Sequence, residues 1–248
     1  HGGVSRNVVE DIANVELKPT FVSVVDKTGI STDVIDKLNR HKVNTQYIQK
    51  TDDGLGTWLA IFNNEGDVFA SISKRPDLSP ISEMLDLYGD EIIRDADSVV
   101  VEIDMESDLL RRIFTLADKY NKKVYAVVSN MSIASERRDL MKQTDCVVCN
   151  LQEAEILFSS DYSNHSVEDL AEIISKSAKK AHYPKVVVTM GENGAVYCDE
   201  NGYGICPAQK TAVVDTTGAG DAFFAGVAIG LTYHKTLAEA CQIGTKLA

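Results

Sequence analysis

Residues 213–226 read VVDTTGAGDAFFAG, a pattern typical of a strand that ends in a glycine-rich turn and leads directly into a helix. Gly218 and Gly220 lack a Cβ, so a ligand can approach their backbone closely. Their N–H groups, with that of Ala219, are expected at the helix N-terminus, where unpaired donors and the helix dipole favour phosphate. Asp221 would lie in the first helical turn, where a carboxylate is expected to be a weak base. A Gly-Ala-Gly turn alone would more often be structural than functional.

Apolar runs alternate with segments of helical spacing along most of the chain. The runs are near-continuous, as in strands covered on both faces, and lie at 21–25, 98–103, 124–128, 146–149 and 185–190. Helices are predicted at 6–14, 31–40, 107–120, 135–141, from about 151, at 167–180 and at 219–231. Ser31 or Thr32 is the expected N-cap of the second helix. Strand and helix in repetition indicate an α/β fold with a mostly parallel central sheet.

Residues 45–73 depart from this pattern, because apolar side chains alternate there between two faces. Residues 63–67 read NNEGD, which is a strong turn signal. We predict a β-hairpin beside the main sheet. It would serve either as an antiparallel extension of the sheet edge or as a lid over a substrate cleft. A hinge is predicted at 76–80, between two prolines.

Composition sets further bounds on the function. With 248 residues, 44% of them hydrophobic, the chain can bury one sizeable core, and we expect a single domain over residues 1–248. The net charge of -12 argues against binding to nucleic acid or to an anionic membrane. It leaves open a phosphate held locally by backbone N–H groups. No apolar run approaches the roughly 20 residues of a membrane span.

The cysteines indicate free thiols. An odd, scattered set in a chain of this length is typical of a reducing, cytoplasmic compartment. Cys146 and Cys149 form a Cys-x-x-Cys pair, but a zinc ribbon needs a second pair, and the sequence has none. The segment also reads as a buried strand, where an odd separation places the two thiols on opposite faces of the sheet. We therefore expect no metal or redox site there.

The string DTTGAGDAFFAG at 215–226 resembles the signature of ribokinase-like (PfkB) kinases. The resemblance implies that Asp221 is the general base for a substrate hydroxyl. It also implies that Gly218, Ala219 and Gly220 form an anion hole for the transferred phosphoryl group. Asp215 and Thr217 match residues that help to hold a monovalent cation, K⁺, in relatives. The implied fold is a three-layer α/β sandwich with a small β lid.

Asn150 and Glu153 resemble the family's Asn-x-x-Glu motif, which follows a strand. The resemblance implies that Asn150 faces the ATP phosphates and that Glu153 positions Mg²⁺, through water. The same spacing also fits the start of a helix, with Asn150 as the N-cap of a capping-box-like turn. The two interpretations are compatible, and taken alone the structural one is favoured.

Residues 189–194 read TMGENG and resemble the family's Thr-x-Gly-x-x-Gly nucleotide loop. The resemblance assigns Thr189, Gly191 and Gly194 to ATP binding. A structural interpretation competes here too, because Asn193-Gly194 favours a hairpin turn between strands at 186–188 and 195–197.

At the start of the chain, GGVSRN at 2–7 resembles the family's Gly-Gly-x-x-x-Asn substrate motif. Gly3 and Asn7 would contact sugar hydroxyls, and this form of the motif is most similar to that of the pseudouridine kinase branch. The resemblance covers nearly the whole chain. However, the family's first strand and its C-terminal part, which walls the adenine pocket, are expected outside it. An acidic residue that is frequent after the strand at 124–128 is replaced by Ser129-Asn130.

The implied activity is ATP-dependent phosphorylation of a primary hydroxyl, on a pseudouridine-like nucleoside or a sugar of the ribose or fructose type. A homodimer through the 45–73 hairpin is also compatible with it. A sugar-acid substrate would need a cationic site, for which Arg6, Lys74 and Arg75 are the candidates, although Lys74-Arg75 is more typical of a solvated pair. A catalytically silent sugar or nucleotide sensor is the alternative from another class. A Rossmann dehydrogenase is excluded for want of a Gly-x-Gly-x-x-Gly fingerprint after an early strand.

Overall fold

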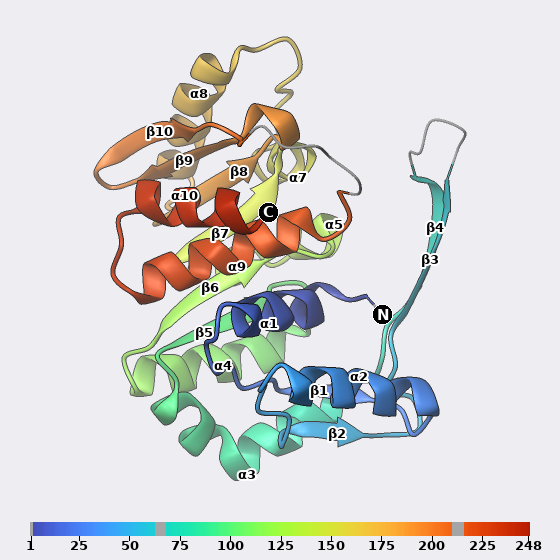
Figure 1. The fold of residues 1–248 in the computed structure, drawn as a ribbon. Helices are drawn as coiled ribbons and strands as arrows, with labels where there is room; N and C mark the ends of the chain where they lie inside the picture. Colours follow the sequence, from blue (N-terminus) through green and yellow to red (C-terminus); the bar gives the residue numbers. More distant parts are fainter. Residues whose placement is uncertain (1, 63–67, 210–215) are drawn as a thin grey trace.

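A six-stranded sheet forms the centre of the protein, which we describe from a computed structural model over residues 2–62, 68–209 and 216–248 (Figure 1). The strand order is β10-β9-β8-β7-β6-β5, with β5 to β8 parallel and the β8–β9 and β9–β10 pairs antiparallel. The strands are β5 (Ser98–Glu102), β6 (Lys123–Val127), β7 (Cys146–Asn150), β8 (Val186–Thr189), β9 (Ala195–Asp199) and β10 (Gly202–Cys206). The predicted α/β fold with a mainly parallel sheet is confirmed.

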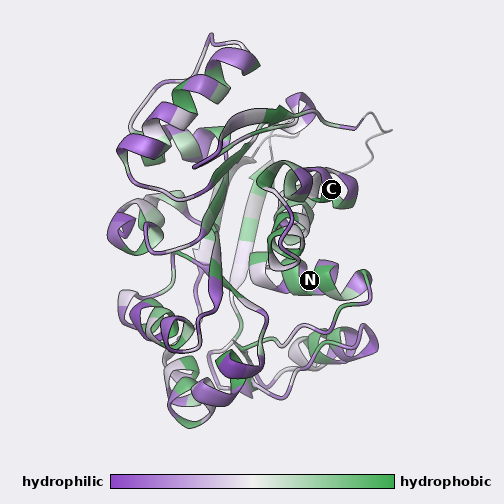
Figure 2. Ribbon diagram, turned by 90° about the vertical axis from the view of Figure 1, so that its left-hand side faces the viewer, coloured by the Kyte–Doolittle hydropathy of each residue, from purple (hydrophilic) through white to green (hydrophobic). Residues whose placement is uncertain are grey.

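Helices cover both faces of this sheet, so the molecule has three layers (Figure 2). One face packs against α1 (Val4–Asn14), α9 (Ala219–Thr232) and α10 (Leu237–Leu247). The other packs against α3 (Ser79–Asp95), α4 (Ser107–Lys119), α5 (Met131–Ser135), α6 (Arg138–Met141), α7 (Leu151–Phe158) and α8 (Val167–Lys180). None of the helices in the described ranges is long and apolar enough to cross a membrane.

Strand β7 shows why the central strands read as continuous apolar runs. Cys146 and Val148 belong to the core beneath α9, whereas Val147 and Cys149 belong to the opposite core. The expectation that the two thiols lie on opposite faces is therefore confirmed. All five cysteines are free and buried. Burial raises the pKa of the Cys146 thiol to about 12, which keeps it protonated and unreactive at neutral pH.

Several predicted element bounds need correction. Helix α2 (Gly29–Arg40) starts before Ser31, and its N-cap residue is Thr28. Ser31 is instead buried inside the first turn, where its hydroxyl donates to Asp26 Oδ1 at 2.6 Å. The expected helix at 135–141 is two short helices, α5 and α6. Two helices, α3 and α10, had not been predicted, and Pro80 lies in the first turn of α3, a position that tolerates proline.

Two small sheets lie outside the central one. Strand β1 (Ser23–Val25) pairs in parallel with β2 (Ile48–Lys50). Strands β3 (Thr57–Phe62) and β4 (Val68–Lys74) form an antiparallel ribbon, the β3–β4 ribbon, which projects away from the rest of the protein (Figure 1). The predicted hairpin thus begins at Thr57, since residues 48–50 pair elsewhere, and its turn at 63–67 lies outside the described residues.

Helices α9 and α10 approach each other closely because of glycine. A Cβ placed on Gly226 would lie 2.6 Å from both the Cα and the N of Gly244. No real Cβ contact is that short, so the backbone of one helix would have to move. The glycine pair therefore fixes the position of α9, the helix whose first turn carries Asp221.

We predict that Gly226→Ala lowers the free energy of unfolding by about 1–3 kcal/mol, because the added methyl group overpacks the α9–α10 contact. Gly29→Ala is the matched control, since a Cβ at that position of α2 meets no atom within 4 Å. Urea unfolding of both variants measures the difference. Equal stability of the two variants would contradict the role given to the glycine pair.

Candidate active site

The first turns of α1 and α9 meet at one point. Asn7 lies near the start of α1 and Asp221 near the start of α9, and the Asn7 amide Nδ2 donates to Asp221 Oδ2 at 2.6 Å. The two residues are 214 positions apart in the chain. The fold therefore brings together the residues that the sequence assigned to the substrate and to the base.

The glycine-rich turn at the start of α9 faces open space. Gly218 is the N-cap residue with φ of 85°, a left-handed conformation that favours glycine. A Cβ added at Gly218 or at Gly220 would meet no atom of the described residues within 4 Å. The N–H of Ala219, one of three predicted anion-hole donors, donates to the Thr216 carbonyl at 3.1 Å and so closes the turn. Asp215 lies outside the described residues.

A pocket of about 440 Å³ lies beside this turn, between α1, α2 and the start of α9. Arg6 and Asn7 line it from α1, and Thr217 and Gly218 line it from the turn. Gly3 precedes α1 as its N-cap residue, with φ of 116°, and its carbonyl accepts the Asn7 N–H at 2.9 Å. The substrate motif thus shapes the helix start that presents Asn7 to Asp221.

Carboxylates that the sequence analysis did not single out surround Asp221. Glu102, at the end of β5, accepts hydrogen bonds from Ser5 N at 3.0 Å and from Ser5 Oγ at 2.5 Å, which satisfies the start of α1. Asp11, on α1, is close enough to Asp221 for the two charges to interact. The available signal for Glu102 was a carboxylate near the end of the apolar run at 98–103, because the carboxyl ends of parallel strands carry binding sites.

Burial sets the acidity of this cluster. It raises the pKa of Asp221, and the nearby negative charge of Glu102 raises it further, whereas the Asn7 hydrogen bond and the positive charge of Arg6 lower it. Burial likewise raises the pKa of Asp11, with a further contribution from the charge of Asp221. The expectation that Asp221 is a weak base is therefore wrong, because burial and the charge of Glu102 raise its pKa more than Asn7 and Arg6 lower it.

Asn150 and Glu153 form a complete capping box at the start of α7. Asn150 Oδ1 accepts the Glu153 N–H at 2.9 Å, and Glu153 Oε2 accepts the Asn150 N–H at 2.7 Å. The structural interpretation of this motif is confirmed. Burial raises the pKa of Glu153 and the Asn150 N–H lowers it. Within the described residues no group of three or more histidine, cysteine or acidic side chains is arranged to hold a metal ion.

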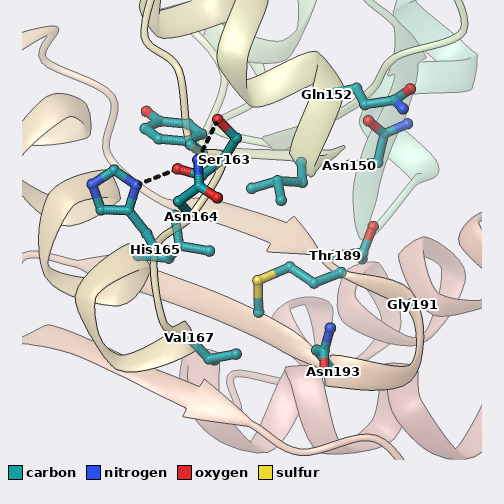
Figure 3. A pocket seen from close by; sticks show the side chains of 13 residues that line it. Asn150, Gln152, Ser163, Asn164, His165, Val167, Thr189, Gly191 and Asn193 are labelled. Carbon is teal, nitrogen blue, oxygen red and sulfur yellow. Dashed lines mark hydrogen bonds between the residues drawn. The ribbon is translucent and has the colours of Figure 1, made fainter.

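A second pocket, of about 500 Å³, opens between the ends of β7 and β8 and the start of α8 (Figure 3). Asn150, Thr189 and Gly191 line it, as the predicted nucleotide residues. Gly194 does not, because it packs where a Cβ would be 2.2 Å from the Cys206 carbonyl oxygen. The hairpin between β8 and β9 is also observed, so the structural interpretation of this loop is confirmed.

The root of the β3–β4 ribbon is tied to the central sheet by a buried carboxylate. Asp104, two residues after β5, has a fully buried side chain that pairs with Arg75. Arg75 Nη1 also donates to the Asp104 carbonyl at 3.0 Å, and Ser129 Oγ donates to Asp104 Oδ2 at 2.8 Å. The expectation of a solvated Lys74-Arg75 pair holds in part, because the Arg75 side chain is 43% exposed but its guanidinium also pairs with the buried Asp104. Ser129 stands where the sequence was expected to have an acidic residue, and it binds Asp104, which follows the neighbouring strand β5.

We predict that Arg75→Met lowers the free energy of unfolding by about 3 kcal/mol, because it leaves the Asp104 carboxylate buried without its counter-charge. The matched control is Arg111→Met, which removes an arginine from an exposed pair with Asp139 and should cost about 0–1 kcal/mol. Thermal and urea unfolding give both values. A cost for Arg75→Met no larger than that of the control would show that Asp104 does not depend on Arg75.

Comparisons with known proteins show the family to which this chain belongs. A family model described as pfkB family carbohydrate kinase matches residues 1–248. Guanosine-inosine kinase of Exiguobacterium acetylicum is 36% identical to this chain over 100% of the chain and 82% of the relative. Pseudouridine kinase of Escherichia coli strain K12 is 27% identical over 92% of the chain and 72% of the relative. Ribokinase of Staphylococcus aureus strain COL is 25% identical over 99% of the chain and 79% of the relative.

Solved structures share the fold. Arabidopsis thaliana ribokinase, complexed with ribose and ATP, aligns with a TM-score of 0.80 at 20% identity, over 98% of this chain and 78% of that one. Adenosine kinase of Sinorhizobium meliloti aligns with a TM-score of 0.79 at 18% identity, over 99% of this chain and 76% of that one. The architecture is therefore ribokinase-like. With a family model that spans all 248 residues and a relative at 36% identity, this protein belongs to the pfkB family of carbohydrate kinases.

Proposed function

We propose that this kinase transfers the γ-phosphoryl group of ATP to the primary hydroxyl of a nucleoside, and that the preferred acceptor is a purine nucleoside of the guanosine or inosine type. The observation that carries the chemistry is the Asn7–Asp221 hydrogen bond beside the open glycine-rich turn. The acceptor is proposed from the 36% identity to guanosine-inosine kinase, which exceeds the 25–27% to ribokinase and pseudouridine kinase. Pseudouridine and ribose- or fructose-type sugars are the competing acceptors.

Asp221 would act as the general base. It would orient the acceptor hydroxyl for in-line attack on the γ-phosphorus and accept its proton as the new P–O bond forms and the bond to ADP breaks. The raised pKa of Asp221 supports this role, because a stronger base takes up the proton more readily. Asn7 would hold both the base and a sugar hydroxyl, which places the reacting oxygen next to the carboxylate.

The start of α9 would stabilise the charge that develops on the transferred phosphoryl group. The backbone N–H groups of Gly218–Gly220 would supply the hydrogen-bond donors, and the helix dipole would add a favourable field. A ligand can approach the two glycines, since no described atom lies within 4 Å of a Cβ placed there. If the turn binds the phosphoryl group with the Ala219 N–H, that group has to exchange its bond to Thr216 for one to the ligand. Thr217 and Asp215 remain the proposed K⁺ residues.

The remaining ATP contacts are proposed for the ends of β7 and β8. Asn150, Thr189 and Gly191 line the same pocket and would face the phosphates of Mg-ATP. Glu153 could hold a water molecule of the Mg²⁺ shell. The capping box uses Oε2, and a water needs only the other carboxylate oxygen. The proposed role of Gly194 is limited to shaping the loop, since it does not line the pocket.

The β3–β4 ribbon is proposed as the lid over the acceptor. Its root at Arg75 is fixed to Asp104, two residues beyond Glu102, so the ribbon starts next to the reaction site. Trp58, Leu59 and Ile61 are exposed on it. Apolar side chains there would exclude water from the closed site, and pairing with a second copy of the chain would cover them.

We predict that the protein, with Mg-ATP, phosphorylates guanosine or inosine faster than pseudouridine, ribose or fructose. Asp221→Asn should lower kcat by about 100- to 10,000-fold and leave ATP binding nearly unchanged, because it removes the proton acceptor and keeps the shape. Coupled release of ADP measures turnover, and Asp139→Asn, an exposed site, is the matched control. Turnover on pseudouridine or a sugar alone would replace the proposed acceptor. ATP binding without turnover on any acceptor would favour a silent sensor.

The pH dependence of kcat/KM should follow the ionisation of Asp221. The base works only when ionised, so kcat/KM should fall as the pH drops through its pKa, and this acid limb should lie above the ordinary aspartate pKa of about 3.9. Glu102→Gln should move the limb to lower pH, because it removes a negative charge that raises the pKa of Asp221. A pH profile of kcat/KM for both proteins checks this. An identical limb in the variant would contradict the coupling.

A further inference from the structure

Arg6 lies between a buried carboxylate and the amide that holds the proposed base. Its Nη2 donates to Asn7 Oδ1 at 2.5 Å, and its Nη1 pairs with Glu10 Oε2. All three side chains come from α1, with Glu10 one helical turn after Arg6, and the Arg6 side chain is largely buried. Glu10, Arg6, Asn7 and Asp221 thus form one continuous chain of hydrogen bonds.

This chain fixes the orientation of the Asn7 amide. An asparagine amide has a donor end and an acceptor end of nearly equal shape, and only its partners decide which way it points. The guanidinium of Arg6 has donors only, and the ionised carboxylate of Asp221 has acceptors only. One orientation satisfies both neighbours: Oδ1 toward Arg6 and Nδ2 toward Asp221. The flipped amide would place an oxygen against the carboxylate and an N–H₂ group against the guanidinium.

Arg6 is itself held in place from two helices. Glu10 is buried, and besides Arg6 it accepts a hydrogen bond from Lys37 Nζ of α2 at 2.7 Å, with His41 Nε2 at 3.8 Å. Burial raises the pKa of Glu10, but the Lys37 hydrogen bond and the charges of Arg6, Lys37 and His41 lower it overall, so the carboxylate stays ionised. A fixed, ionised Glu10 gives the Arg6 guanidinium a single position from which it reaches Asn7.

We infer that Arg6 is a positioning residue for phosphoryl transfer, which locks the Asn7 amide so that one Nδ2 hydrogen holds Asp221 and the other is free for the acceptor hydroxyl. Asn7 and Arg6 both line the pocket beside the glycine-rich turn, where the acceptor would lie. The inference rests on the proposed kinase function. It adds Arg6, which precedes Asn7 in the GGVSRN string at 2–7, to the site and gives it a role that acts through Asn7.

Loss of Arg6 should have two separable effects. The amide becomes free to flip, so Asp221 and the acceptor are no longer held in register, and kcat/KM for the nucleoside should fall about 10- to 100-fold, with little change in KM for ATP. The positive charge that favours the Asp221 carboxylate is also lost, so its pKa should rise. The charged groups that face Asp221 are Arg6 and Asp11 from α1 and Glu102 from β5.

The experiment compares Arg6→Met with Arg6→Lys. Lysine keeps the charge, but its single ammonium cannot span Glu10 and Asn7 as a planar fork does. We expect Arg6→Met to move the acid limb of kcat/KM to higher pH and to lower the rate. Arg6→Lys should restore the position of the limb and leave the rate low. Arg111→Met, which removes an arginine from an exposed pair, is the control. It should match the wild type in the rate and in the position of the acid limb.

A second readout needs no turnover. In protein labelled with ¹³C at aspartate carboxyls, the Asp221 signal, assigned with Asp221→Asn, should titrate at higher pH in Arg6→Met than in the wild type. Should Arg6→Met fail to fold, Arg6→Lys alone tests the lock through its lowered rate at an unchanged limb. An unchanged Asp221 titration together with wild-type kcat/KM in the Arg6 variants would overturn the inference. A wild type inactive on every acceptor would overturn the proposed function instead, and the titration would still decide whether the charge of Arg6 acts on Asp221.

Discussion

The hydrogen bond between Asn7 and Asp221 is the contact on which the rest of the site depends, because it joins two helix starts from opposite ends of the chain. Each helix is placed by a separate device. Glycines at the contact with α10 set the depth of α9, and Glu102 of β5 accepts two hydrogen bonds from Ser5 at the start of α1. A donor and an acceptor 2.6 Å apart tolerate little error in either placement. The core packing of this face is therefore a condition for the chemistry.

The electrostatics around Asp221 and the start of α9 are determined by nearby groups and not by the net charge of the protein. The chain carries a net charge of -12, and Glu102 and Asp11 add negative charge around Asp221. In the proposed function, anionic phosphate would bind there because the start of α9 presents backbone donors, and the Mg²⁺ of ATP would neutralise much of its charge. The negative charge of Glu102 raises the pKa of Asp221, which would favour its proposed role as the base. The positive charge of Arg6 acts in the opposite direction and lowers the pKa of Asp221.

Much of the fold could be predicted from the sequence, because parallel strands buried on both faces read as apolar runs and the glycine-rich turn fixes where a helix begins. Helix α3 was missed because its first turn contains Pro80, which reads as a hinge when its packing is unknown. Of the site, the glycine turn, Asn7 and Asp221 could be assigned from motifs. Glu102 and the Asp104–Arg75–Ser129 cluster could not, since their roles arise from contacts between residues far apart in sequence.

A crystal structure with guanosine and a non-hydrolysable ATP analogue bound together tests the central claim most directly. The account predicts that the acceptor's primary hydroxyl lies within hydrogen-bond distance of an Asp221 carboxylate oxygen, with Asn7 on the ribose. It also predicts that the γ-phosphate of the analogue lies at the N–H groups of Gly218–Gly220. A nucleoside hydroxyl held away from Asp221, or a γ-phosphate bound at another edge of the sheet, would contradict it.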